Sequence, residues 1–293
     1  MKNLNIFCFG FGQVAKNFIN KINLKKYNIN LSTTSRSETS KKTFNGIEYQ
    51  NYLLKDKNYD YALISKLKES DHILISIPPI EEIDIVTKQF SKYIKESKAK
   101  WITYLSATSV YGNHDGCWVD ENSKTKPTTK NGISRLKAEN EWISLKRKYN
   151  LPIQVLRLSG IYSNKENILA RLRSGTAKLV NKKNHYFSRI HVDDIGNILF
   201  ESLTKFRSGE IYNLSDDKPT SSQEITLYGA KLLNIENIEV IEVEDIESKM
   251  VKNFYKDSKK INNKKMKEFF NYRLKFPTYV EGLNYIRDNF IKL

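Results

Sequence analysis

The sequence predicts an α/β fold, in which a doubly wound parallel sheet is followed by a smaller α+β lobe. Three observations support this fold class. The 293 residues are enough for one large domain or two unequal ones. In the first half, short apolar runs alternate with segments of helical periodicity, which is typical of parallel strands joined by crossover helices. A glycine-rich turn directly follows the first apolar run.

Composition excludes several classes of protein. Hydrophobic residues make up 39% and aromatic residues 12% of the chain, which is too apolar for a disordered protein. The apolar runs are too short to span a membrane, so we expect no membrane partner. Two cysteines, Cys8 and Cys117, cannot form a disulfide framework, and they favour a reducing compartment such as the cytoplasm. No metal site is expected.

The chain is strongly basic, with 49 Lys and Arg against 33 Asp and Glu, a net charge of +16. The lysines are dispersed over the whole sequence, which favours a solvated surface over a nucleic-acid groove. A basic pocket for an anionic small molecule remains open. The lysine-rich stretch Lys252–Lys267 is expected to be a solvated helical surface rather than a binding tail.

Apolar periodicity predicts the elements of the first half in order. Strands are expected at residues 4–9, 28–34, 72–77, 101–105 and 153–158. Helices are expected from residue 14 to residue 22 and at 61–67, 83–94 and 132–148. This part, residues 1–160, is predicted to be a dinucleotide-binding domain.

The second half, residues 161–293, is less regular and is predicted to be a substrate-binding lobe, with some chain returning to the sheet. Helices are expected at residues 168–173, 193–206, 222–233 and 278–291, with short strands near 210–214 and 238–243.

The turn after the first strand has the pattern G-x-G-x-x-G/A, formed by Gly10, Phe11, Gly12, Gln13, Val14 and Ala15. The first glycine permits the tight turn, the second lets the backbone approach a pyrophosphate, and the small last residue lets the helix pack on the strand. The phosphates then lie at the helix N-terminus. The alternative is a glycine turn without a ligand, and the strand-turn-helix context favours dinucleotide binding.

The end of the second strand indicates which dinucleotide is bound. An Asp or Glu that would select NAD is missing there, and Ser35 and Arg36 occupy the place where a 2′-phosphate would lie. Guanidinium pairs with phosphate bidentately, so NADP is favoured over NAD. The alternative is that Arg36 is an ordinary exposed loop residue.

Further segments resemble the extended branch of the short-chain dehydrogenase/reductase superfamily, the nucleoside-diphosphate-sugar epimerases and dehydratases, and most of all an atypical bacterial subgroup. These segments span nearly the whole chain in family order: 105–112 (LSATSVYG), 157–162 (RLSGIY), 189–195 (RIHVDDI), 211–214 (IYNL) and 276–279 (FPTY). The resemblance implies a Rossmann sheet that binds the dinucleotide, with Pro78 and Ser106 among its contacts, and a C-terminal lobe that covers a substrate cleft. A homodimer is also expected by resemblance.

The catalytic residues of that superfamily are a Ser or Thr and a Tyr-x-x-x-Lys pair on a helix, where the Lys lowers the Tyr pKa for proton transfer. At the matching positions this sequence has Ala107, Asn131 and Arg135. Asn cannot transfer a proton, so the usual triad is broken. A literal Tyr-x-x-x-Lys at Tyr255 to Lys259 lies outside the expected context, and we interpret it as a chance match.

Other groups are candidates for the missing roles. Asn131 and Arg135 stand at the family's Tyr and Lys positions, and Thr108 is adjacent to Ala107. Tyr111 is expected at the carboxyl end of the strand 101–105, where open α/β sheets bind ligands. These four residues are the catalytic candidates, with His114, Asp115 and His191 as alternatives from nearby loops. Each has a structural alternative: Tyr111 could simply pack in its loop, and His191 with Asp193 could cap the following helix.

Three residues, Arg157, Arg189 and His191, are candidates for binding an anionic substrate such as a nucleotide sugar. The two arginines could equally form ion pairs. Two hypotheses follow for the protein. The first is an NADP-dependent oxidoreductase or epimerase-like enzyme with unusual proton-transfer residues, and the second is a catalytically inactive NADP(H)-binding regulator or scaffold.

Overall fold

The computed structural model describes residues 3–291, with the side chains of all but 249 and 250. The chain divides into two compact units. The first unit comprises Met1–Ala107, Ile133–Arg157 and Ile195–Tyr212. The second unit comprises Thr108–Gly132, Leu158–Asp194 and Asn213–Leu293. Each unit is therefore assembled from three separate stretches of sequence.

A nine-stranded sheet forms the centre of the first unit, with the order β13-β9-β7-β6-β1-β2-β4-β3 and β5 paired to β4. The strands from β7 to β4 pair in parallel, whereas β3 and β5 run antiparallel to β4. Their bounds are β1 Asn3–Phe9, β2 Asn28–Ser35, β3 Ser40–Phe44, β4 Ile47–Lys55, β5 Asn58–Tyr59, β6 His72–Ile75, β7 Trp101–Ala107, β9 Ile153–Leu158 and β13 Ile211–Leu214. This mostly parallel, Rossmann-like sheet confirms the predicted fold class.

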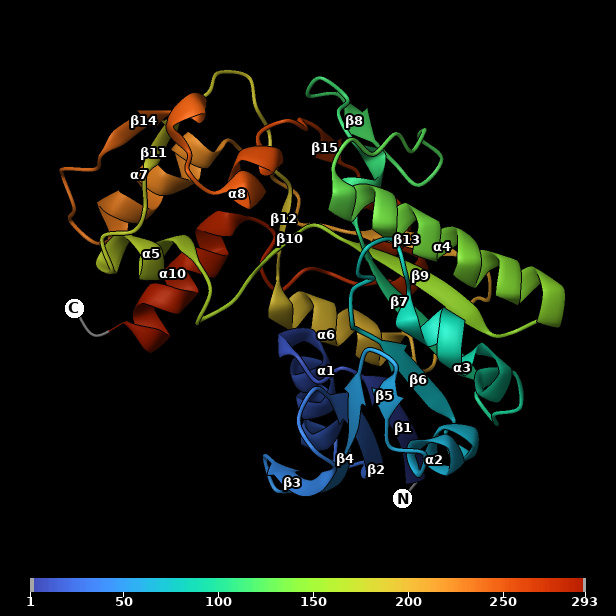
Figure 1. The fold of residues 1–293 in the computed structure, drawn as a ribbon. Coiled ribbons are helices and arrows are strands. Elements are labelled where there is room, and N and C mark those ends of the chain that lie inside the picture. Colours follow the sequence, from blue (N-terminus) through green and yellow to red (C-terminus); the bar gives the residue numbers. More distant parts are fainter. Residues whose placement is uncertain (1–2, 292–293) are drawn as a thin grey trace. The chain divides into compact units, whose positions relative to one another are not determined.

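Helices cover both faces of the sheet (Figure 1). On one face, side chains of β1 such as Phe7 and Phe9 share a buried cluster with Phe90 and Trp142 from two helices. On the other face, the backbone at Gly196 lies close to Asn17, so two further helices pack side by side. The helices are α1 Gln13–Leu24, α2 Leu63–Glu69, α3 Ile85–Lys95, α4 Lys130–Tyr149 and α6 Val192–Glu201; α2, α3 and α4 cover the first face, and α1 and α6 the second.

The hairpin formed by β3 and β4 was not predicted from the sequence. Its signal was the Asn45-Gly46 turn, where both residues have positive φ, as a type I′ hairpin turn requires. The strands around it carry many polar residues and lie at the edge of the sheet, so their apolar periodicity is weak. The chain therefore passes from β2 to the parallel strand β4 through a strand rather than through a helix.

Three short parallel strand pairs and several helices make up the second unit. The strand pairs are β10 Gly160–Tyr162 with β12 Arg189–His191, β11 Leu179–Asn181 with β14 Val240–Glu242, and β8 Trp118–Val119 with β15 Lys260–Ile261. The helices are α5 Ile168–Arg173, α7 Ser222–Leu232, α8 Lys249–Phe254, α9 Lys264–Phe270 and α10 Tyr279–Phe290, with 3-10 turns at Thr108–Tyr111 and Val243–Asp245. A cluster that includes Leu169, Ile225 and Leu283 packs α5, α7 and α10 together.

The prediction of a solvated helical surface over Lys252–Lys267 was wrong. Helix α8 ends at Phe254, and the chain then runs inward, so that the Lys259 residue is only 9% exposed. Backbone hydrogen bonds explain this path, because the Ser258 carbonyl accepts from the N–H groups of His114 and Gly116, both at 3.0 Å. A lysine-rich composition does not reveal such long-range backbone pairing.

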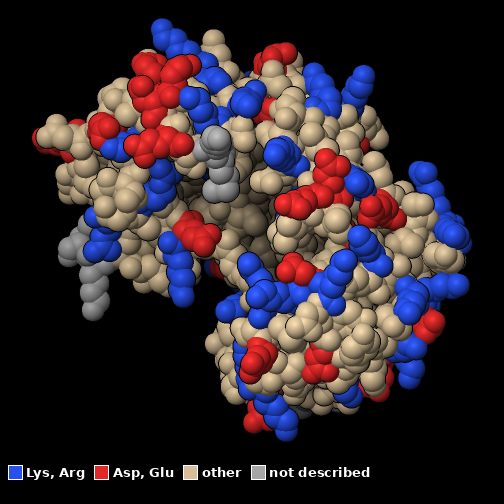
Figure 2. Space-filling model, viewed as in Figure 1, with Lys and Arg blue, Asp and Glu red and all other residues tan. Residues whose placement is uncertain are grey.

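Charge is spread over the surface. On the face shown in Figure 2, Lys and Arg side chains are scattered, with Asp and Glu side chains among them. This distribution favours a solvated surface, as the dispersed lysines of the sequence suggested. No helix within residues 3–291 combines the length and the apolar character needed to cross a membrane.

Candidate functional site

The turn after β1 is shaped by Gly10. This residue has a φ of +86°, and a Cβ there would lie 2.6 Å from Ile77 Cγ2. The Gly10 N–H donates to Thr34 Oγ1 at 3.0 Å, and its carbonyl accepts from the Ser76 hydroxyl at 3.3 Å. Only glycine combines this backbone conformation with this close packing, so the turn is fixed against both neighbouring strands.

Next in the turn, Gly12 is the N-cap residue of α1, and it has no side chain with which to cap the first helical turn. A Cβ at Gly12 would meet no atom within 4 Å, and the neighbouring Gln13 is exposed. Uncapped N–H groups at an open helix N-terminus are suited to an anion, because they need acceptors and the helix dipole is positive there. Phe11 packs on Phe44 and Tyr49, at ring-centroid distances of 5.4 and 5.0 Å, which holds the turn beside β4. Val14 is buried.

The end of β2 lies beside this turn, since β1 and β2 pair in parallel with Cys8 opposite Thr33. Ser35 is the last residue of β2, and its Oγ accepts from the Ser37 N–H at 3.2 Å. Arg36 follows and is exposed. Parallel strands end at the same edge of a sheet, so the structure brings Gly12, Ser35 and Arg36 to one edge, as a dinucleotide site requires.

Two further predicted residues lie near the carboxyl ends of β6 and β7. Pro78 is exposed three residues after β6, and Ser106 is the second-last residue of β7, where it is only 2% exposed. Among the residues that the structure describes, no group hydrogen bonds to Ser106 Oγ. The Arg135 guanidinium reaches the same strand and donates from Nη1 to the Leu105 carbonyl.

Tyr104 interacts with Arg135. The ring of Tyr104 stacks on that of Trp142, with 6.1 Å between the centroids. Burial raises the pKa of Tyr104, and the nearby Arg135 charge offsets only part of this rise. Burial therefore disfavours the phenolate form of Tyr104.

Arg157 lies on β9 and is 4% exposed. Its Nε and Nη2 atoms bind the carboxylate of Glu139 on α4, with distances of 2.8–3.2 Å. This pairing is the ion-pair alternative considered above, and it gives Arg157 a structural role within the first unit. A substrate contact for Arg157 stays a prediction.

The remaining predicted catalytic residues belong to the second unit. Tyr111 is fully buried, and its hydroxyl donates to Asn213 Oδ1 at 2.7 Å. Asn131 is exposed in the first turn of α4. The next residue, Gly132, lies very close to the Ser109 backbone. A Cβ on Gly132 would be 2.6 Å from the Ser109 carbonyl oxygen. The start of α4 is thus brought against the 3-10 turn that begins at Thr108.

Arg189 and His191 both lie on β12. Arg189 donates from Nη1 to the carbonyls of Phe187 and Thr220, both at 3.1 Å. The Nδ1 atom of His191 accepts from the Asp193 N–H at 3.1 Å, so His191 caps α6. Its ring packs on Phe276 at 4.3 Å. Both side chains therefore hold loops of the second unit, and their contact with a substrate stays a prediction.

The Tyr255-x-x-x-Lys259 match belongs to the second unit, whereas the glycine turn belongs to the first. Both residues are buried, and burial lowers the pKa of Lys259. Its Nζ atom lies 4.0 Å from Asp257.

Comparison with known proteins supports the fold and the family. Residues 81–215 match the NAD dependent epimerase/dehydratase family. The matched region is therefore similar to this family. It includes the region of Ser106, Thr108, Tyr111, Asn131, Arg135, Arg157, Arg189 and His191. No curated protein matches the chain.

Solved structures extend the likeness over the whole chain. A functionally unknown conserved protein from Silicibacter pomeroyi is 28% identical, with a TM-score of 0.85 and 99% of each chain covered. UDP-glucuronic acid 4-epimerase from Bacillus cereus, solved with NAD, is 16% identical, with a TM-score of 0.76 and coverage of 98% of this chain and 97% of that one. dTDP-glucose 4,6-dehydratase from Bacillus anthracis, also solved with NAD, is 21% identical, with a TM-score of 0.77 and coverage of 98% and 96%. At these identities, the two epimerase/dehydratase structures show a shared fold.

The side chains that hold the candidate residues were not predicted from the sequence. Thr34, Glu139 and Asn213 each bind a predicted site residue, and each is far from its partner in the sequence. The one local signal was the i, i+4, i+8 spacing of Asn131, Arg135 and Glu139, which puts them on one face of α4.

Proposed function

We propose that this protein binds NADP(H) and is an epimerase/dehydratase-like oxidoreductase that works without the usual Tyr-Lys pair. The observation that carries the proposal is the open, uncapped N-terminus of α1 at Gly12, beside Ser35 and Arg36 at the end of β2. The uncapped N–H groups fit a pyrophosphate, and the exposed guanidinium fits a 2′-phosphate. NADP is thereby favoured over NAD.

When bound, the dinucleotide would supply hydride transfer. The residues of this chain would bind and orient it. Arg135 replaces the family's Lys, and because its Nη1 is held on the Leu105 carbonyl, the rest of its guanidinium is positioned to donate to ribose hydroxyls. The Ser106 hydroxyl, which has no partner among the described residues, is a second donor at the same strand end.

The substrates that we propose to try first are nucleotide sugars, because the similar structures include a UDP-glucuronic acid epimerase and a dTDP-glucose dehydratase. Thr108 and Tyr111 are the proposed polar groups for the substrate oxygen, in place of Ala107. Tyr111 would have to exchange its hydrogen bond with Asn213 to act, which makes a slow reaction the expected outcome.

The test is a calorimetric titration of the protein with NADPH and with NADH, repeated on Arg36→Ala. We expect tighter binding of NADPH, and loss of that preference in the variant. NADPH at a hundredfold excess over its Kd should also stabilise the fold by about 2.7 kcal/mol. Lys41→Ala, at an exposed cation of β3 in the same unit, is the matched control and should keep the preference. Failure of both dinucleotides to bind would contradict the proposal.

A second candidate, an inactive NADP(H)-binding regulator, is favoured by Asn131, whose amide cannot exchange a proton. The two candidates separate when NADPH oxidation is followed with UDP-4-keto sugars and simple carbonyl compounds. Turnover that falls in Arg135→Ala supports the enzyme. Tight NADPH binding without turnover supports the regulator.

A further inference from the structure

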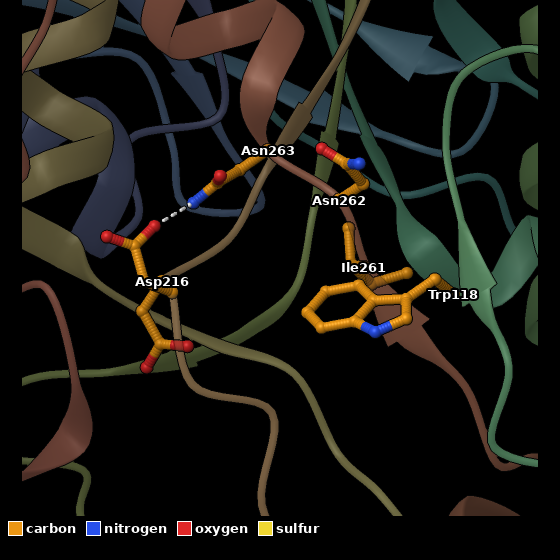
Figure 3. Close-up of a pocket in the computed structure, with 6 residues that line it drawn as sticks. Trp118, Asp216, Ile261, Asn262 and Asn263 are labelled. Atoms are coloured by element: carbon orange, nitrogen blue, oxygen red, sulfur yellow. Dashed lines mark hydrogen bonds between the residues drawn. The ribbon is translucent and has the colours of Figure 1, made fainter.

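Lys259 is a lysine that the fold fixes in place and largely encloses. It directly precedes β15, the strand whose Ile261 is drawn in Figure 3. Backbone hydrogen bonds hold the chain on both sides of it, since the Ser258 carbonyl accepts from two N–H groups and the Lys260 N–H donates to the Cys117 carbonyl at 2.9 Å. Only 11% of the Lys259 side chain is exposed. Lysines are almost never buried to this extent unless they are paired.

The ammonium group of Lys259 has little compensation for this burial. Among the described residues, no group hydrogen bonds to its Nζ atom, and the exposed part of the side chain includes Nζ. The carboxylate of Asp257 lies 4.0 Å from Nζ, which is beyond hydrogen-bond distance. Asp257 Oδ1 already accepts from the Thr128 hydroxyl at 2.7 Å. Lys259 Nζ is therefore reachable from solvent and has no hydrogen-bond acceptor of its own.

Positive charge predominates around this amine. Burial, and then the charges of Lys182 and Lys259, lower the pKa of His185 to about 4, so both ammonium groups lie close to its ring. The charge of Asp257 acts on the ring in the opposite direction. Lys182 is held in place, because its Nζ atom donates to the Tyr255 carbonyl. Two cations against one carboxylate favour a negatively charged ligand.

Burial also acts on the amine itself. It disfavours the ammonium form and lowers the pKa of Lys259, and the charge of Asp257 opposes this only in part. A desolvated lysine amine beside another cation is activated as a nucleophile for carbonyl compounds. The neighbouring Lys260 lies in a different environment, since its Nζ atom is 4.2 Å from the centroid of the Tyr186 ring, where the ammonium form is favoured.

We propose that Lys259 binds a short 2-oxo acid covalently, as a Schiff base, with the carboxylate of the acid facing Lys182. The neutral amine adds to the carbonyl carbon, so a C–N bond forms and the carbonyl electron pair moves to the oxygen. The nitrogen loses a proton and the oxygen gains one. Loss of water then breaks the C–O bond, so one amine and one 2-oxo acid give one imine and one water. This activity does not depend on a bound dinucleotide.

The test traps the imine on the full-length protein with sodium cyanoborohydride. Glyoxylate is the probe, because reduction of its imine leaves a carboxymethyl group that mass spectrometry assigns to a particular lysine. We expect labelling of Lys259 to be about fivefold faster than labelling of Lys260 near neutral pH. The rate at Lys259 should rise with pH to a midpoint below 10.5, the ordinary lysine value.

Variants separate the amine from the charge beside it. Lys259→Arg keeps a positive charge, but a guanidinium does not form this imine, so labelling should stop at position 259 and continue at the other lysines. The labelling map of the unmodified protein needs no variant, so the test stands even if Lys259→Arg does not fold.

A second variant examines the carboxylate of the ligand. Lys182→Met removes the cation that faces it and should slow labelling of Lys259 by glyoxylate about fivefold. Labelling by acetaldehyde, which has no carboxylate, should change by less than about twofold. Lys183→Met, at the exposed neighbouring lysine, is the matched control and should leave both rates unchanged.

Three results would overturn the proposal. They are no labelling of Lys259 by glyoxylate, labelling no faster than that of Lys260, and an equal effect of Lys182→Met on the glyoxylate and acetaldehyde rates. NADPH binding is measured in the same samples, so a failed cofactor assignment is distinguished from a failed Schiff-base site.

Discussion

At the scale of single residues, Gly10 and Gly46 differ in why a side chain would be unfavourable there. Both have positive φ, +86° and +78°. A Cβ at Gly10 would lie 2.6 Å from Ile77 Cγ2, whereas a Cβ at Gly46 would meet no atom within 4 Å. Gly46 therefore needs glycine for its backbone conformation alone, and Gly10 needs it for packing as well.

We predict that Gly46→Ala lowers the free energy of unfolding by about 1 kcal/mol, the cost of the left-handed backbone. Gly10→Ala should cost about 1–3 kcal/mol more, because the strand-end packing must also shift. Urea denaturation of the two variants measures both values. Equal losses would show that Ile77 moves aside freely.

At the scale of elements, α4 is tied to β9 by the buried ion pair between Glu139 and Arg157, whose side chains are 2% and 5% exposed. Burying the pair removes two charges from water, which costs desolvation free energy. The bidentate hydrogen bonds between the two side chains compensate that cost. Removing one partner leaves the other charge buried.

Glu139→Gln should therefore destabilise the protein by about 3–5 kcal/mol, and the double variant Glu139→Leu, Arg157→Met should recover much of that loss. Glu69→Gln breaks the exposed pair of Glu69 with Lys66 and should change the urea midpoint little. A double variant less stable than Glu139→Gln would contradict this account of the pair.

At the scale of the whole molecule, stability should depend on pH through His185. The residue is 3% exposed, and burial lowers its pKa to about 4, assisted by the charges of Lys182 and Lys259. Between pH 6.5 and pH 4 the unfolded chain binds a proton at this site that the folded protein does not bind. This contribution to stability is therefore present above pH 6.5 and is lost as the pH falls toward 4.

His185→Phe should reduce the slope of unfolding free energy against pH in this window, because phenylalanine keeps the packing on Phe187 and Tyr255 without titrating. Urea denaturation at several pH values between 4.5 and 7.5 measures the slope. An unchanged slope would mean that other groups carry the acid sensitivity.

The sequence alone determined the features that depend on local spacing. Apolar periodicity indicated the parallel sheet and most helices, and the pattern around Gly10 and Gly12 indicated the turn before α1. These predictions succeed because a buried strand and an amphipathic helix each impose a short, regular repeat on the chain. The β3–β4 hairpin was missed because an edge strand needs no such repeat.

The tertiary structure decided which groups meet. Tyr111 and Asn213 form a hydrogen bond although they are 102 positions apart in the sequence. A pocket in the second unit is lined by Trp118, Asp216 and Asn263, which come from three stretches of the chain. The same holds for Lys259, which composition assigned to solvent and the fold buries. Local spacing cannot encode such contacts, because burial and pairing depend on free energies summed over the packed chain. The sequence therefore determined the sheet and the glycine turn, and only packing decided the partners of the candidate side chains.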